Sequence, residues 1–247
     1  MPLEQEGAGP GFPPHGLDPE LYAACAALAD APRRRAALDP KIRELVALAL
    51  DAAVTHLHEP GIRRHVRGAL EHGATREEIM ETLQLAATIG VHAASTGFPL
   101  LNGLPAAPGA SAQDGQDDPD GADGVRRREE VKAEFVRRRG YWEAAWEDVL
   151  RHAPGFFAAY LRFSALPWSP GVLEPKVKEL VYIAVDASAT HLFTGGLKVH
   201  IGNAVRHGAT ADEIAGVLEI ASTIGLQTLE VGVPILLGEL ERREGGR

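Results

Sequence analysis

The sequence predicts an all-α fold built from two tandem helical repeats. Residues 40–101 match residues 175–236 at 28 of 62 positions, at a constant offset of 135 and without a gap. Apolar residues recur in both copies at spacings of three and four, as they do on the buried face of a helix. The pattern contains neither alternating strands nor hairpin dipeptides. Since one copy alone would form only a marginal core, we expect the repeats to pack as a pseudo-two-fold unit.

Four parts are predicted along the chain. Residues 1–17 are rich in Gly and Pro and are expected to be poorly ordered. Repeat 1 covers 18–104, and the small, acidic and turn-forming residues of 105–124 predict a flexible linker. The remainder, 125–247, contains repeat 2 after a connecting helix that we expect over 125–153. Two tryptophans in that helix are expected to cover the core.

Each repeat carries start and stop signals for three helices, shown here for repeat 1. Pro40 follows an acidic residue and marks the first position of a helix. Gly73 fits the left-handed residue that ends the second helix. Thr75 and Glu78 have the spacing of a capping box, which starts the third helix. Gly90 interrupts that helix, and the same signals recur 135 residues later.

Composition excludes several classes of protein. A net charge of -9 and a pI near 5.6 argue against a nucleic-acid partner, which would require clustered Lys and Arg. We see no apolar run of about 20 residues and no leader-like start, so we expect a cytoplasmic protein without a membrane partner. The single cysteine, Cys25, excludes an internal disulfide and is expected to be a buried structural thiol.

Polar positions that recur in both repeats are the candidates for chemistry. Repeat 1 reads E-x11-H-x8-H through Glu44, His56 and His65, and repeat 2 repeats this pattern with Glu179, His191 and His200. A histidine with a carboxylate that fixes its tautomer can relay protons, although the same residues could simply join two helices by hydrogen bonds.

The placement of Glu44 leaves two alternatives. An unbroken helix would put Glu44 about 18 Å from His56. It must therefore either reach His65 from the next, antiparallel helix or belong to a site completed by another repeat or subunit. Asp51 and Asp186 also recur, and because an unpaired buried carboxylate is unfavourable, we expect them to have structural partners.

The stretches KIRELVALALDAAVTHLHEPGIRRHVRGALEHGATREEIMETLQLAATIG and KVKELVYIAVDASATHLFTGGLKVHIGNAVRHGATADEIAGVLEIASTIG resemble the carboxymuconolactone decarboxylase family. This family also contains thiol peroxidases of the alkylhydroperoxidase D type. Peroxidase members carry E-x11-C-x-x-C-x3-H, and neither repeat has these cysteines, so thiol peroxidase activity is disfavoured. Decarboxylase members show an H-E pair followed by a histidine, which resembles His58, Glu59 and His65, with a gap two residues longer here.

Repeat 1 is the more polar copy at the positions that differ. It has His58, Glu59, Arg63 and His92, where repeat 2 has Phe193, Thr194, Lys198 and Gln227. Imidazoles, a carboxylate and an arginine suit a small anionic organic substrate, because Arg pairs with carboxylates and a buried acid can protonate an enolate. Arg63 and His92 are therefore the expected substrate-binding residues.

The expected function is that of a cofactor-independent lyase of the decarboxylase type, acting on a small carboxylate or lactone and holding no metal. The predicted catalytic residues are His65 as acid/base, with Glu44, His56, His58, Glu59, His200, His191 and Glu179. Two alternatives remain open: a metal-dependent His/Glu site, and a non-catalytic binding or assembly protein that kept the fold. We also expect a homo-oligomer, specifically a trimer resembling the six-copy assemblies of single-repeat relatives.

Overall fold

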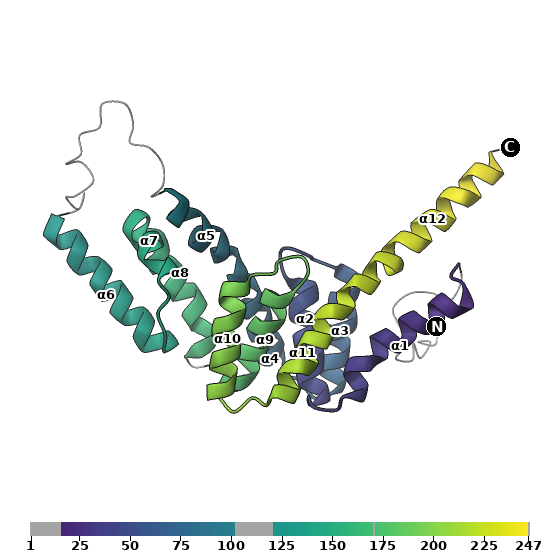
Figure 1. The fold of residues 1–247 in the computed structure, drawn as a ribbon, viewed down its shortest axis with the longest axis horizontal. Helices are drawn as coiled ribbons and strands as arrows, with labels where there is room; N and C mark the ends of the chain where they lie inside the picture. Colours follow the sequence, from purple (N-terminus) through teal and green to yellow (C-terminus); the bar gives the residue numbers. More distant parts are fainter. Residues whose placement is uncertain (1–15, 102–120, 170, 247) are drawn as a thin grey trace. The chain divides into compact units, whose positions relative to one another are not determined.

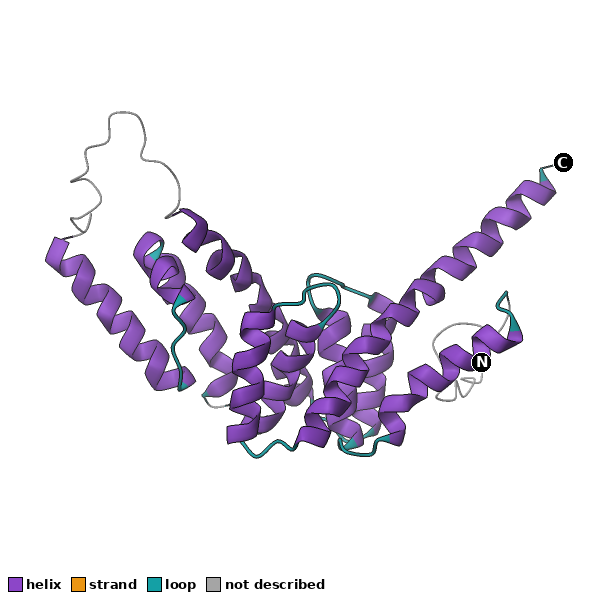
Figure 2. Cartoon of the chain, in the orientation of Figure 1, coloured by secondary structure: helices purple, strands orange, loops and turns teal. Residues whose placement is uncertain are grey.

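A computed structural model describes residues 16–101, 121–169 and 171–246 of the chain. Among these residues the structure is helical, with no strand, and the predicted all-α class is confirmed (Figures 1 and 2). Most of the expected disordered segment 1–17 and of the expected linker 105–124 lies outside the described residues. The last residues of the expected linker, from Gly121, begin a helix.

The chain divides into two compact units that do not follow the repeat boundaries. The first, here called the repeat unit, consists of Met1–Ala86 and Pro175–Arg247. The second, the connecting unit, consists of Ala87–Glu174. The helices of the repeat unit are α1 (Pro19–Arg34), α2 (Pro40–Ala52), α3 (Glu59–Glu71), α4 (Arg76–Ala87), α9 (Pro175–Ala187), α10 (Thr194–Arg206), α11 (Ala211–Thr223), the 3-10 helix η3 (Ile224–Leu226) and α12 (Gln227–Gly245).

Equivalent helices of the two repeats pack together in the repeat unit. Helix α2 packs on α3 as α9 packs on α10, and α2 and α9 also contact each other. Side chains of α2 and α9 fill the interior, with Leu45 and its repeat counterpart Leu180 fully buried. The hydroxyls of Thr55 and Thr190, which are 135 residues apart, lie 3.3 Å from each other where the copies meet. These pairings are those of a pseudo-two-fold arrangement.

The predicted helix signals are confirmed. Gly73 has φ +82°, the left-handed conformation that ends α3. At the start of α4, the Thr75 backbone donates to Glu78 at 2.7 Å, and the Thr75 hydroxyl accepts from the Glu78 backbone at 3.1 Å. The same box caps α11 through Thr210 and Glu213. The Glu78 carboxylate also accepts from Lys41 on α2 at 2.8 Å, so the cap ties two helices together.

The connecting unit has an aromatic core. Phe135, Trp146 and Phe157 are buried, and Trp142 packs against them, so the prediction that both tryptophans cover a core is confirmed. The expected single helix over 125–153 is wrong, because Gly140 adopts φ +76° and ends the helix Gly121–Arg139. The elements here are η1 (Thr88–Val91), α5 (His92–Leu101), α6 (Gly121–Arg139), α7 (Ala145–His152), α8 (Pro154–Ala165) and η2 (Leu166–Trp168).

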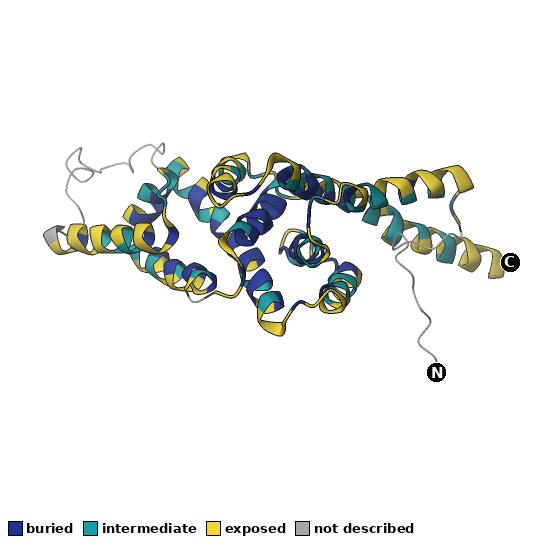
Figure 3. Cartoon of the chain, turned by 90° about the horizontal axis from the view of Figure 1, so that it is seen from below, coloured by how far each residue is buried: buried dark blue, intermediate teal, exposed yellow. Residues whose placement is uncertain are grey.

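Helix α12 is the least buried element of the repeat unit. None of its residues is buried, and Figure 3 shows it beside α1 with its surface mostly exposed. Together α11, η3 and α12 form a run over 211–245 that is long and apolar enough to cross a membrane by length and composition alone. Core helices of soluble proteins pass the same test. The expected absence of a membrane partner therefore stays a prediction.

Candidate functional site

Glu44 and His65 form the centre of the candidate site in repeat 1. Glu44 is buried on α2, and its Oε2 lies 2.7 Å from Nδ1 of His65 on α3. The antiparallel packing of α2 and α3 thus brings together two residues that are 21 positions apart. Of the two alternatives for Glu44, the structure shows the one in which it reaches His65. Gly68 on α3 makes room for this carboxylate, since a Cβ there would lie 2.7 Å from Oε2.

Repeat 2 contains the same pair in a more enclosed form. Nδ1 of His200 lies 2.6 Å from Oε2 of Glu179, and both side chains are buried. Asn203 occupies the position equivalent to Gly68, and its amide donates to the other Glu179 oxygen at 3.2 Å. The ring of Tyr182 stacks on His200 with centroids 4.5 Å apart. The second pair is therefore covered by side chains that repeat 1 lacks.

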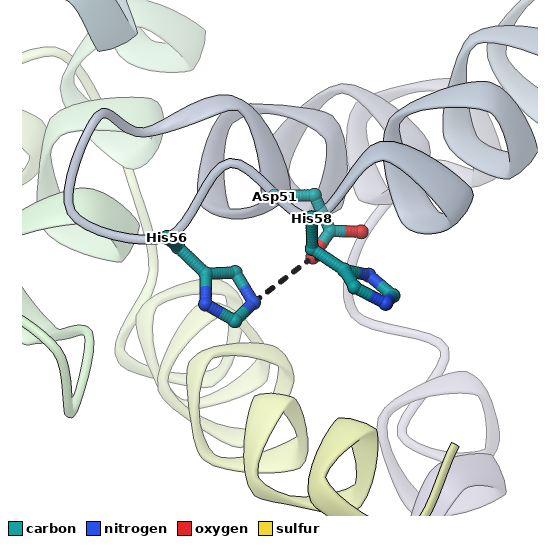
Figure 4. Close-up of side chains that lie close together, drawn as sticks. All are labelled: Asp51, His56 and His58. Carbon is teal, nitrogen blue, oxygen red and sulfur yellow. Dashed lines mark ion pairs between the residues drawn. The ribbon is translucent and has the colours of Figure 1, made fainter. Parts of the chain in front are cut away.

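A tight loop after α2 brings two further histidines to the site. Leu57 adopts φ +48°, which is unusual for a side chain of this size. The backbone N–H of His58 then returns to the carbonyl of Asp51 at 2.9 Å. This turn places His56 and His58 on either side of the Asp51 side chain (Figure 4). The loop recurs in repeat 2, where Leu192 has φ +49°.

Asp51 lies within the candidate site, which its place in an apolar helix did not indicate. Its buried carboxylate faces three histidines: Nε2 of His56 at 3.7 Å, Nδ1 of His58 at 3.8 Å and Nε2 of His65 at 3.6 Å. The available signal was its recurrence as Asp186, whose Oδ2 lies 4.0 Å from Nε2 of His200. In both repeats the histidine therefore has one carboxylate near each ring nitrogen.

Gln227 is a second member of the candidate site that the sequence did not predict. It is the first residue of α12, and its amide nitrogen donates to Oδ1 of Asp51 at 2.7 Å. Its amide oxygen is hydrogen-bonded to Nε2 of His56. Repeat 2 thus supplies a side chain to the site of repeat 1.

The site groups residue types that bind metals, so its fit to an ion can be tested. Ligand atoms of Asp51, His56 and His58 lie within 4.8 Å of one another. The ring nitrogens that face Asp51 already have partners, because Nε2 of His56 bonds to Gln227 and Nδ1 of His58 accepts from the Gly61 backbone at 3.2 Å, capping α3. An ion in this place would displace these bonds, whereas ligands of metals usually have their outer hydrogen bonds intact. The arrangement fits a hydrogen-bonded network better than a metal centre.

One carboxylate in each repeat has a shifted pKa, and the two shifts have opposite signs. Burial by itself would raise the pKa of Glu44, but the hydrogen bond and charge of His65 and the nearby charges of Arg33 and Arg43 bring it below its ordinary value. Glu44 is therefore an ionised acceptor, and His65 carries its proton on Nδ1. In repeat 2, burial and then the charge of Glu179 raise the pKa of Asp186 to about 8. At neutral pH Asp186 is mostly protonated.

Other predicted site residues lie elsewhere. Glu59 and Arg63 are exposed on the first turns of α3 and bond to each other at 2.9 Å, so the structure does not bring them into the cluster. His92 begins α5 in the connecting unit. His191 lies on the repeat 2 loop next to the ring of Phe193, and burial lowers its pKa. The roles predicted for these four residues stay predictions.

Comparison with known proteins identifies the family. The carboxymuconolactone decarboxylase family model matches residues 19–102 and 154–231, which is well over half of the chain. A crystal structure of a candidate gamma-carboxymuconolactone decarboxylase subunit from Burkholderia xenovorans is 44% identical, with a TM-score of 0.80. That similarity covers 92% of this chain and 88% of the other. No curated protein shows a significant match. The chain belongs to the carboxymuconolactone decarboxylase family.

Proposed function

We propose that the chain is a lyase of the decarboxylase type, in which His65 transfers a proton to or from a small substrate that bears a carboxylate or lactone. The geometry of His65 carries this proposal. Its Nδ1 is held by Glu44 at 2.7 Å, and its Nε2 lies 3.6 Å from Asp51. A histidine held at one nitrogen presents the other in a fixed direction, which is what a general acid or base requires.

The two carboxylates have different parts in this chemistry. Glu44 accepts a hydrogen bond from Nδ1–H of His65, so the lone pair of the neutral ring lies on Nε2. When Nε2 takes up a proton, the imidazolium lies between Glu44 and Asp51, and nearby negative charge favours the charged ring. The same pair of groups thus fixes the ring and stabilises its protonated form.

A decarboxylation by this site can be written so that atoms and charges balance. The bond between a substrate carbon and its carboxylate breaks, and CO2 leaves. The electron pair stays on the carbon and is delocalised into a conjugated lactone carbonyl. Protonated His65 then delivers the Nε2 proton to that carbon, and neutral His65 regains a proton from water. His65 is the catalytic residue of this scheme, and Glu44 is a positioning residue.

Repeat 1 is the proposed working copy. Its histidine and carboxylate lack the cover that Tyr182 and Asn203 give to the His200 pair. The neutral form of Asp186 also leaves His200 without a negative charge beside its Nε2 at neutral pH. We therefore assign turnover to the His65 pair and a structural role to the His200 pair.

The test compares two matched substitutions in the full chain. The first substrate to try is gamma-carboxymuconolactone, which the name of the solved relative suggests, followed by other small lactones and dicarboxylates, with CO2 release as the readout. His65→Asn keeps a hydrogen-bonding group of similar size and is expected to lose about 100- to 10,000-fold in rate. His200→Asn is expected to lose much less. Full turnover by His65→Asn with a lower melting temperature would show that His65 is structural.

A further inference from the structure

The side chain of Gln227 connects two residues of the repeat 1 site from a different repeat. Its amide nitrogen lies 2.7 Å from Oδ1 of Asp51, and its amide oxygen bonds to Nε2 of His56. The side chain of Asp51 is buried, with 2% of its surface exposed, and that of His56 is mostly buried, with 18% exposed. An amide placed between two such groups has to satisfy both at once.

The chemistry of the partners fixes how this amide is oriented. The NH2 group of Gln227 faces Asp51, because it donates to Oδ1 of that carboxylate, and a carboxylate oxygen without a proton can only accept. The amide oxygen then faces His56, and because a carbonyl oxygen can only accept, His56 must donate. The neutral ring of His56 therefore carries its proton on Nε2. This tautomer follows from the donor that Gln227 presents to Asp51 and the acceptor that it presents to His56.

Holding one oxygen of Asp51 determines where the other points. Oδ1 accepts from Gln227, whereas Oδ2 is buried without a hydrogen-bond partner among the described residues. Oδ2 lies 3.6 Å from Nε2 of His65. A buried oxygen without a donor is unfavourable unless a charged or polar group approaches it. The amide thus keeps this acceptor directed towards the nitrogen that would gain a proton.

We propose that Gln227 is a positioning residue for the repeat 1 site, supplied by repeat 2, which locks His56 in the Nε2-protonated tautomer and orients Asp51 towards His65. The part of this inference that concerns turnover rests on the proposed function. The part that concerns the tautomer of His56 rests on the hydrogen bonds alone. The two parts can therefore fail separately.

Of the two repeats, only repeat 2 has a glutamine at this position. The equivalent position in repeat 1 is His92, so the two sites cannot be oriented by the same group. A second contact between α12 and repeat 1 offers a matched control. Glu230, one turn along α12, accepts a hydrogen bond from Arg64 on α3 at 3.1 Å. Removing Glu230 loosens α12 without touching the amide network.

The experiment measures histidine tautomers in the full-length protein labelled with 15N. Long-range 1H–15N spectra distinguish a protonated from an unprotonated ring nitrogen, and loss of one signal in His56→Asn assigns His56. The native protein is expected to show His56 protonated on Nε2 only. Gln227→Leu is expected to give a mixture of tautomers for His56, while Glu230→Gln keeps the native pattern. Protonation of His56 on Nδ1, or an unchanged pattern in Gln227→Leu, would overturn the inference.

A second variant keeps the test decisive if Gln227→Leu does not fold. Gln227→Glu has the same shape but presents two acceptors, so it loses the donor to Asp51 and can still accept from His56. It is expected to keep His56 protonated on Nε2 and to lower turnover through the altered Asp51. Loss of the Nε2 proton in this variant would contradict the proposed role of the amide oxygen. If the tautomers behave as expected while His65→Asn remains fully active, the proposed function fails and the positioning of His56 and Asp51 stands.

Discussion

The carboxylate of Asp51 lies in the space that a side chain at position 61 would occupy. A Cβ built on Gly61 would stand 1.7 Å from Oδ2 of Asp51 and 2.7 Å from Nδ1 of His58. Helix α3 can approach the site this closely only because its third residue has no side chain. Repeat 2 has the same relationship, with a Cβ on Gly196 at 2.2 Å from Oδ2 of Asp186.

Gly61→Ala is therefore expected to destabilise the protein and to disturb the site. The added methyl group must displace Asp51 or the start of α3, and such overpacking costs roughly 1–3 kcal/mol. Chemical denaturation measures this loss. The matched control is Gly202→Ala in the middle of α10, where a Cβ meets nothing within 4 Å. That change is expected to stabilise by up to about 1 kcal/mol through helix propensity. Equal effects of the two substitutions would contradict the steric argument.

Asp186 is expected to make folding less favourable as the pH rises. Burial and the charge of Glu179 raise its pKa from 3.8 to about 8, so the folded protein holds this proton over a range in which the unfolded chain has lost it. The stabilisation is complete below about pH 4 and is lost as the pH rises to about 8. The free energy of unfolding lost over this range is on the order of a few kcal/mol.

Asp186→Asn removes this contribution. The quantity to follow is the difference in free energy of unfolding between the native protein and this variant. The free energy of unfolding is measured for both proteins from pH 4 to pH 9, so that groups common to both cancel. The stability of the native protein relative to the variant should fall steadily with rising pH. A constant difference over this range would show that Asp186 titrates with an ordinary pKa.

Thiol peroxidase activity is expected to be absent. The single cysteine is buried in α1, as predicted, and neither repeat has the attacking and resolving pair that hydroperoxide reduction needs. An assay with an organic hydroperoxide and a dithiol should give no turnover above background, in the native protein and in Cys25→Ser alike. Activity that Cys25→Ser abolishes would mean that Cys25 is a reactive thiol.

Chains are expected to associate, as trimers. The exposed face of α12 carries four large apolar side chains, each at least 44% exposed: Val231, Ile235, Leu236 and Leu240. Exposed apolar surface on this scale commonly marks an interface. Light scattering at micromolar concentration should give three times the chain mass of 26.3 kDa. A monomer at that concentration would refute this expectation, and Leu236→Lys should weaken a trimer held by this face.

Sequence alone could predict those parts of the site that local rules determine. The capping box at Thr75 and the glycine that ends α3 depend on residues within a few positions of each other, and the structure confirms both. The pairing of Glu44 with His65 could be foreseen as one of two alternatives, because antiparallel helices bring such positions together. These features need no knowledge of how the repeats pack.

The remainder depended on contacts that the sequence does not encode locally. Gln227 meets Asp51 across 176 positions, and nothing near either residue indicates that contact. Asp51 itself was expected to be structural, because a lone carboxylate in an apolar helix gives no sign of the three imidazoles around it. The sequence predicts a continuous helix through Gly140, whereas the left-handed conformation of this residue separates α6 from α7.

The amide of Gln227 gives the tandem arrangement a genetic consequence. Were the two copies separate, identical chains, a single codon would determine both this position and its counterpart, and every substitution would appear twice. Here one gene encodes Gln227 and His92 separately. A mutation can therefore change the residue that bonds to Asp51 while the equivalent residue of the other repeat stays the same. One repeat can specialise without any change in the other.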